Sequence, residues 1–211
     1  MKPEKFWDIV AKNYDKTEDH LKLIFTRIIE NSIKYFNSND KVMDFGCGTG
    51  SFAIEIASRV NKVNAIDISS KMIEIAKQKA EINNIENTSF EQVSLFNNKF
   101  KKDSFDIITA FGIIHLLNEN TKIIHRIYKL LKPGGLFISS TPCLAERMTL
   151  KTKLQFYPAL ILSKSGLIDQ CLKRFRINEL QSIIQTDNFE ILYSEVIFHK
   201  LTAYYCVVKK I

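Results

Sequence analysis

The stretch that decides the fold reads KVMDFGCGTGSFA, from Lys41 to Ala53. An apolar run breaks into three glycines and then resumes in a helix-like pattern, which predicts a strand, a tight turn and a helix. Glycine is needed where the backbone adopts a positive φ or touches a ligand, and the amide groups at a helix start point back toward that ligand. The stretch therefore predicts a site for a nucleotide-like molecule.

Two details of this stretch narrow the ligand. The spacing is G-x-G-x-G, with Ser51 where the dinucleotide fingerprint has its third small residue, which argues against NAD. Asp44 stands two residues before Gly46 and would place a carboxylate at the strand end, where it would repel a pyrophosphate. A ligand that carries an ammonium and a sulfonium would instead be attracted, because opposite charges interact strongly in a partly dry cleft.

Four motifs follow one another along the chain. They are DFGCGTG from Asp44, NAIDIS from Asn64, FDIIT from Phe105 and LLKPGGL from Leu130. In this order and spacing they resemble the motifs of class I S-adenosylmethionine-dependent methyltransferases, and among these the small-molecule type similar to the enzymes of ubiquinone and menaquinone biosynthesis. The resemblance covers about residues 40 to 141. It implies an α/β, Rossmann-like, doubly wound sheet of seven strands, mostly parallel with one antiparallel strand, and helices on both faces.

Members of this family hold S-adenosylmethionine, and the product S-adenosylhomocysteine, near the carboxyl ends of the strands. The resemblance carries cofactor binding to Asp44, Gly46, Cys47, Gly48, Gly50, Asp67, Ile68, Met72, Ser94, Leu95 and Phe111. Asp67 ends the second predicted strand, where a carboxylate can accept both hydroxyls of a ribose. Ile68 and Met72 would contact the adenine, with ordinary helix packing an equal alternative for Met72. Phe111 would lie near the methionine portion.

The residue at Ser94 departs from the family pattern, because many members carry an acid there that accepts a hydrogen bond from the adenine amino group. A serine hydroxyl accepts the same bond more weakly. We therefore expect selectivity for adenine to depend on the backbone N–H of Leu95, and a cofactor affinity below that of typical members.

Two side chains are candidates for acid–base chemistry. His115 follows the fourth predicted strand, Phe105 to Phe111, at a position that similar small-molecule enzymes often fill with histidine. A general base should titrate near neutrality, as an unperturbed histidine does; the alternative is a structural histidine at a helix start. Tyr14 shares one side of a predicted short helix with Trp7 and Val10. The resemblance implies an aromatic residue over the cofactor or substrate here, and plain packing is the equal alternative.

The composition fits one globular domain. The chain has 211 residues, of which 45% are hydrophobic and 25% charged, enough for one full core. It has no apolar run of transmembrane length, and its first residues lack the apolar core of a signal peptide. Its four cysteines form no C-x-x-C pair, so neither a metal site nor a disulfide framework is indicated. We expect a cytoplasmic protein, monomeric or homodimeric.

Hydrophobic periodicity divides the domain into N-terminal helices (residues 1–37), a cofactor-binding core (38–141), an insert (142–176) and a C-terminal helix with a hairpin (177–211). The predicted helices are Thr17 to Phe36, Glu119 to Leu131 and Arg176 to Ile184. The predicted strands after the first are Lys62 to Asp67, Thr88 to Val93, Phe105 to Phe111, Leu136 to Ser140, Phe189 to Phe198 and Thr202 to Lys209. Alternation of strand and helix predicts a parallel sheet covered on both faces. The last two strands must pair antiparallel, because a parallel return needs a much longer connection.

The insert reads as a helical lid. Its segment Met148 to Leu162 mixes apolar and basic residues on both sides of Pro158. A segment after the fifth strand lies above the carboxyl edge of the sheet, so it would cover a hydrophobic substrate with an anionic group, lipid-like or aromatic. A dimer contact or a plain cap is the equal alternative. Cys143 invites comparison with RNA cytosine methyltransferases, but no Pro-Cys follows the fourth strand, so an unreactive thiol near the cleft is expected.

The motifs together predict transfer of a methyl group from S-adenosylmethionine to a small molecule, hydrophobic or anionic. An RNA or protein methyltransferase is one alternative: the net charge of +7 favours it, but the lysines are scattered and the Asn-Pro-Pro-Tyr type of motif is absent. A non-catalytic cofactor-binding module is the other alternative.

Overall fold

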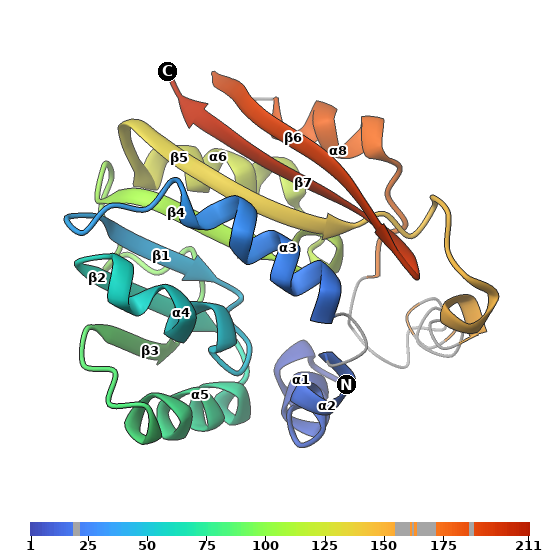
Figure 1. Cartoon of the computed structure of the whole chain (residues 1–211), viewed down its shortest axis with the longest axis horizontal. Helices are drawn as coiled ribbons and strands as arrows, with labels where there is room; N and C mark the ends of the chain where they lie inside the picture. Colours follow the sequence, from blue (N-terminus) through green and yellow to red (C-terminus); the bar gives the residue numbers. More distant parts are fainter. Residues whose placement is uncertain (19–21, 155–160, 162, 164–171, 186–187) are drawn as a thin grey trace.

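Seven strands form one sheet in the computed structural model, which describes residues 1–18, 22–154, 161, 163, 172–185 and 188–211. The strands are β1 (Lys41–Phe45), β2 (Lys62–Asp67), β3 (Thr88–Gln92), β4 (Phe105–Phe111), β5 (Leu131–Pro142), β6 (Phe189–His199) and β7 (Leu201–Lys210). Their order is β3-β2-β1-β4-β5-β7-β6 (Figure 1). Only β7 runs antiparallel to its neighbours among these strands. The predicted fold class and the antiparallel hairpin are confirmed.

Helices cover both faces of the sheet (Figure 1). They are α1 (Pro3–Ala11), α2 (Tyr14–Glu18), α3 (Lys22–Ile33), α4 (Ser51–Ile56), α5 (Ser70–Ile82), α6 (Asn120–Leu130) and α8 (Ile177–Ile184). One apolar cluster joins α3, α4 and α5 to the sheet, and a second joins α6 and α8 to it. The central strands are apolar on both sides because both sides are buried. No helix in the described part of the chain is long and apolar enough to cross a bilayer.

The N-terminal helices differ from the prediction. A single short helix carrying Tyr14 was expected, but α1 ends at Ala11 and Tyr14 begins α2. The amide of Asn13 donates to the carbonyl of Val10 in the turn between them, because asparagine favours turns over helix interiors. The helix predicted from Thr17 to Phe36 also differs, since Thr17 and Glu18 belong to α2 and α3 ends at Ile33.

The fifth strand is longer than predicted. It was expected from Leu136, after a turn at Pro133 and the two glycines. Instead β5 starts at Leu131, which pairs with Phe105 of β4, and the pairing shifts register before Leu136 meets Ile107. The Pro-Gly-Gly segment is therefore an irregularity inside the strand. The insert is helical at residues 150–154; most of the predicted helix beyond them lies outside the described residues.

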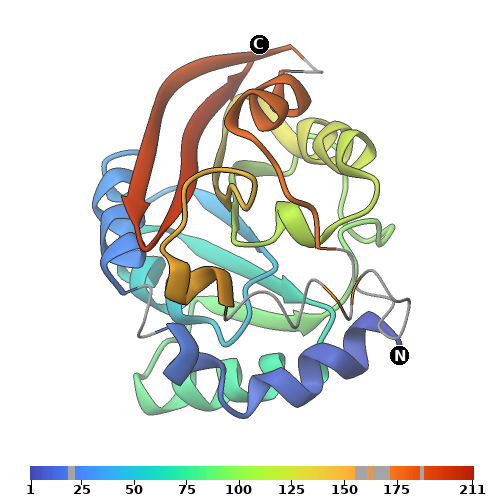
Figure 2. The same ribbon diagram turned by 90° about the vertical axis from the view of Figure 1, so that its right-hand side faces the viewer.

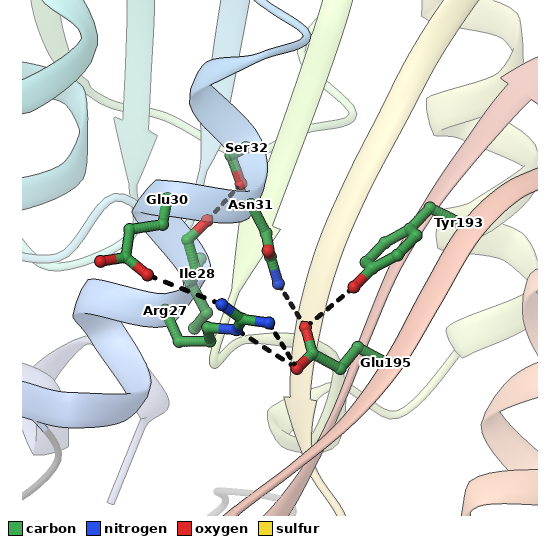
Figure 3. Close-up of polar contacts among 7 residues, drawn as sticks. All are labelled: Arg27, Ile28, Glu30, Asn31, Ser32, Tyr193 and Glu195. Carbon is green, nitrogen blue, oxygen red and sulfur yellow. Dashed lines mark hydrogen bonds and ion pairs between the residues drawn. The ribbon is translucent and has the colours of Figure 1, made fainter.

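Helix α3 is fastened to the edge strand β6 by one carboxylate (Figure 3). Glu195 accepts hydrogen bonds from Arg27 Nη2 and Nε at 3.1 and 3.2 Å, from Asn31 Nδ2, and from the Tyr193 hydroxyl at 3.1 Å. Although burial acts to raise it, these bonds lower the pKa of Glu195. These hydrogen bonds hold α3 against strand β6 of the hairpin.

Candidate functional site

The glycine loop connects β1 to α4 at the carboxyl edge of the sheet. Gly46 has a φ of 75°, and a Cβ there would lie 2.8 Å from the Ile113 side chain. Gly50 has a φ of 77°, and a Cβ there would lie 2.7 Å from the ring of Phe90. Both positions therefore exclude any larger residue by backbone strain and by contact. The loop can therefore turn tightly between β1 and α4 only with glycine at these two positions.

Asp44, at the end of β1, is a buried carboxylate that is only half satisfied. Its Oδ1 accepts a hydrogen bond of 2.7 Å from the Thr109 hydroxyl on β4, and its Oδ2 has no hydrogen-bond partner among the described residues. Burial, and then the charge of Asp67, raise its pKa to about 7. A bare buried oxygen costs free energy unless a donor meets it, so the site favours a ligand with a cationic donor.

Asp67, at the end of β2, faces the same loop. Its Oδ2 accepts from the amide of Gly48 at 3.0 Å and its Oδ1 from the amide of Ser69 at 2.9 Å. Burial outweighs these bonds, so the pKa of Asp67 is raised. A carboxylate has about four acceptor positions, which leaves capacity for two hydroxyl donors. Both acids therefore fit the sugar and ammonium of the predicted cofactor.

Of the residues predicted to contact adenine, two precede β3 in the sequence and two follow it. Ile68 is partly buried beside Asp67, while Met72, in the first turn of α5, is buried to 2% exposure. Ser94 is exposed, and its hydroxyl accepts the amide of Phe96 at 3.2 Å. Leu95 is buried in the core cluster of α6 and α8. The Ser94 hydroxyl thus already holds one local bond, which leaves it a weak partner for a base.

The end of β4 combines apolar side chains with two buried polar groups. Phe111 packs edge-on to Phe52, with ring centroids 4.4 Å apart. The following Gly112 faces open space, since a Cβ there would meet no atom within 4 Å. His115 is buried, and burial lowers its pKa to about 4. His115 Nδ1 and the hydroxyl of Thr141, at the end of β5, have no hydrogen-bond partners among the described residues.

Charged side chains that the sequence analysis missed hold the N-terminal helices over this edge. Asp15 Oδ1 accepts a hydrogen bond of 2.5 Å from the Thr49 hydroxyl of the glycine loop. Asp15 Oδ2 pairs with Lys79 of α5 at 3.2 Å. Asp8 of α1 accepts a hydrogen bond of 2.6 Å from the Ser69 hydroxyl, and this hydroxyl also caps α5. Ser69 after a strand is a recognisable N-cap signal, but nothing local in the sequence points to Asp8.

Tyr14 lies against the loop, because a Cβ on Gly48 would approach its ring to 3.4 Å. Its ring also meets Trp7 edge-on, with centroids 6.4 Å apart. The structure thus brings Tyr14 to the predicted site, with α1 and α2 forming its cover.

The two cysteines near the site are protonated thiols at neutral pH. Burial, with the charges of Asp44 and Asp67, raises the pKa of Cys47 well above its usual range. Burial raises the pKa of Cys143 to about 12. A thiolate is the reactive form, so Cys143 fits the predicted inert thiol.

The sheet order and the half-satisfied acid beside a glycine loop define a class I methyltransferase fold. Residues 36–188 match the family described as "Methyltransferase domain", and the chain belongs to this family. It is 34% identical over 139 residues to the ubiquinone/menaquinone biosynthesis C-methyltransferase UbiE of Bartonella quintana, covering 61% of this chain and 53% of that protein. It is 30% identical over 169 residues to UbiE of Rickettsia typhi, covering 75% of this chain and 68% of that protein.

The chain therefore spans between about half and two thirds of these curated relatives. Among solved structures, the YcgJ protein of Bacillus subtilis superposes with a TM-score of 0.68 at 16% identity, covering 88% of this chain and 98% of that one. At this identity the likeness supports the fold alone. The predicted family is confirmed.

Proposed function

We propose that this protein is an S-adenosylmethionine-dependent methyltransferase whose acceptor is a small apolar molecule. The observation that carries the proposal is Asp44, a buried carboxylate next to the glycine loop whose Oδ2 receives no hydrogen bond from any described residue. Neither a phosphate nor an apolar ligand would relieve that oxygen, whereas an ammonium would. Membership of the methyltransferase-domain family supports the same ligand.

Each acid has a separate task in holding this cofactor. Asp44 would bind the ammonium of the methionine portion and Asp67 the two ribose hydroxyls, with the loop backbone between them. When bound, the cofactor supplies an electrophilic methyl group on a sulfonium. The remaining work of the protein is to hold the acceptor in line and to exclude water, which together account for most of the acceleration of such a transfer. Tyr14 and Trp7 on the docked N-terminal helices are suited to exclude water.

The acceptor side supports an apolar, aromatic molecule. A Cβ on Gly112 would meet no atom within 4 Å, and its neighbours along the chain, Phe111 and Ile113, are apolar. Two relatives are named for ubiquinone and menaquinone biosynthesis, whose products are lipid-soluble quinones. We infer an acceptor of that chemical kind, with RNA and protein acceptors as the alternatives that the experiment separates.

His115 is the candidate for handling a proton. With its pKa lowered to about 4, the imidazole is neutral at pH 7, and its Nδ1 has no hydrogen-bond partner in the part of the chain that the structure describes. The ring could therefore accept a proton or a hydrogen bond from an acceptor hydroxyl. Its driving force as a base is smaller than that of an unperturbed histidine. His115→Gln should lower kcat by about tenfold to a hundredfold with little change in KM; an unchanged kcat would leave His115 a structural residue.

Calorimetry tests the cofactor, and labelled methyl transfer tests the acceptor. S-adenosylmethionine and S-adenosylhomocysteine should both release heat on binding, and NADH should not. Label from the methyl group should then appear in phenolic or quinol acceptors but not in RNA or protein. Binding of NADH in place of the two nucleosides would overturn the proposal, and cofactor binding without transfer to any acceptor would favour the non-catalytic module.

A further inference from the structure

Exposed apolar side chains gather where the insert meets the tip of the β6–β7 hairpin. Leu150 and Leu154, in the helical turn of residues 150–154, are 74% and 65% exposed. Phe198, at the end of β6, is 45% exposed. We call residues 147–154 together with residues 198–200 the edge platform. Figures 1 and 2 both show the insert running beside the hairpin tip.

Hydrogen bonds fix the two halves of the edge platform together. The amide of Thr149 donates to the carbonyl of Lys200 at 2.8 Å. The carbonyl of Arg147 accepts from the amide and the hydroxyl of Thr202 at 3.1 and 2.9 Å. The Arg147 guanidinium lies over the Phe198 ring, 4.7 Å from its centroid. The exposed apolar groups are therefore held on a built surface.

The helical turn of the edge platform is amphipathic, with its polar side buried and its apolar side exposed. Thr152 is buried, and its amide donates to the Thr149 hydroxyl, which caps the turn. At 3.6 residues per turn, Leu150 and Leu154 lie about 40° apart on the side opposite Thr152. Lys151 and Lys153, both exposed, flank them on either side. The turn thus presents an apolar ridge between two cations to solvent.

The edge platform stands at the carboxyl edge of the sheet, where the proposed active site lies. Figure 2 looks onto this edge, with the helical turn of the insert and α1 both in front of the strands. Helix α1 carries Ile9, which is 64% exposed, and has the exposed Glu4 and Lys5 near its start, with the exposed Lys12 directly after its end. Two separate elements at one edge therefore expose apolar groups, and the excess of basic residues belongs to the insert. Residues 147–154 include three basic residues and no acidic one.

We propose that the edge platform docks this protein on an anionic lipid surface. Leucine and phenylalanine side chains insert at the boundary of headgroups and acyl chains, while flanking lysines extend their ammonium groups to lipid phosphates. The charge complementarity selects anionic over zwitterionic lipid. Docking in this orientation would bring the carboxyl edge of the sheet to the bilayer, so that a lipid-soluble acceptor reaches the proposed site without crossing water. The inference adds to the proposed function but does not depend on it.

Vesicle sedimentation tests the proposal with the whole chain and without cofactor or acceptor. The wild-type protein should sediment with vesicles rich in phosphatidylglycerol, less so with phosphatidylcholine alone, and less at high salt. Leu150→Gln/Leu154→Gln should weaken partitioning by at least about tenfold, because two exposed apolar side chains are lost from the contact. Lys151→Gln/Lys153→Gln should weaken it only on the anionic vesicles.

Matched controls change the same chemistry at a distance from the platform. Ile82→Gln removes an apolar side chain that is 78% exposed at the end of α5, and Lys62→Gln/Lys101→Gln removes two exposed cations near the amino ends of β2 and β4. These variants should sediment like the wild type, with all melting temperatures alike. Absence of wild-type sedimentation, or equal loss in the controls, would overturn the proposal. So would a dimer that only the leucine variant dissociates without a change on lipid, since the platform would then be a contact between two copies.

Discussion

Asp44 and Glu195 are carboxylates in opposite surroundings. Glu195 receives bonds from a guanidinium, an amide and a phenol, and its pKa is lowered (Figure 3). Asp44 accepts one hydrogen bond from a hydroxyl, its Oδ2 meets no donor from the described residues, and its pKa is raised to about 7. The first carboxylate is satisfied by the fold and stabilises it. The second costs the fold free energy that a ligand can recover, which is how binding sites differ from structural contacts.

The largest expected effect is on the pH dependence of stability. The folded-state pKa of Asp44 lies above its unfolded value of 3.8, so the folded state holds this proton more tightly and stability falls as pH rises from about 4 to about 7. Asp44→Asn removes this titration. In denaturant unfolding, the difference in the free energy of unfolding between the variant and the wild type should shift in favour of the variant, by up to about 4 kcal/mol, as the pH rises across that window. A difference that stays constant with pH would contradict the raised pKa.

Glu195→Gln supplies the opposite slope. Because the pKa of Glu195 is lowered, its contribution is present above the unfolded pKa and is lost as pH falls through the folded value. The wild type should therefore exceed this variant in stability at neutral pH and approach it in acid. Slopes of the same sign for the two variants would remove the contrast between the two carboxylates.

Cofactor affinity gives the next largest effect. Asp44→Asn should weaken S-adenosylmethionine by about thirtyfold, or about 2 kcal/mol, because a charge-assisted bond to the ammonium is lost. Wild-type affinity should rise with pH as Asp44 ionises near pH 7, and the variant should show no such rise. Glu195→Gln should leave affinity unchanged. Calorimetry at several pH values measures all three, and equal losses in both variants would point to general destabilisation.

Sequence predicted the fold and the ligand loop because those signals are local. The glycines, Asp44 and Asp67 all lie within one strand–turn–helix unit and the strand after it, so spacing alone groups them. The partners that set the chemistry are distant: Thr109 is 65 residues from Asp44, and Asp8 is 61 residues from Ser69. No periodicity records which distant polar group meets which acid, so the unpaired oxygen of Asp44 appears only in three dimensions.

The same reason explains the errors in the elements. The break after Ala11 and the early start of β5 depend on partners elsewhere, since Tyr14 packs on the glycine loop and Leu131 pairs with Phe105. Glu195 stands in an ordinary alternating strand, and its role depends on α3, more than 160 residues earlier. Tertiary contacts of this range override local preference.

A smaller effect is expected on stability from the satisfied carboxylate. Glu195→Gln should lower the free energy of unfolding at neutral pH by about 1 kcal/mol, because the hub of bonds between α3 and β6 loses its charge. Glu190→Gln, an exposed change on the same strand, is the matched control and should be nearly neutral. Denaturant unfolding measures both. An equal loss of unfolding free energy in the two variants would mean that the hydrogen bonds of Glu195 do not stabilise the fold.

The smallest effects are expected from Asp8, a carboxylate that is hydrogen-bonded within the fold and also lies beside the proposed ligand site. Its substitution should change both stability and cofactor affinity slightly. Asp8 accepts hydrogen bonds from the Ser69 hydroxyl and from the amide of Lys71 at 3.0 Å, so Asp8→Ala removes two hydrogen bonds between α1 and the start of α5 and should cost about 0.5–1 kcal/mol. Since Ser69 also holds Asp67, cofactor affinity should fall only a few-fold, about 1 kcal/mol or less. Hydrogen exchange should become faster in α1 while α8 is unchanged. Faster exchange in both helices would mean that α1 docks through the core and that Asp8 has no separate part in covering the site.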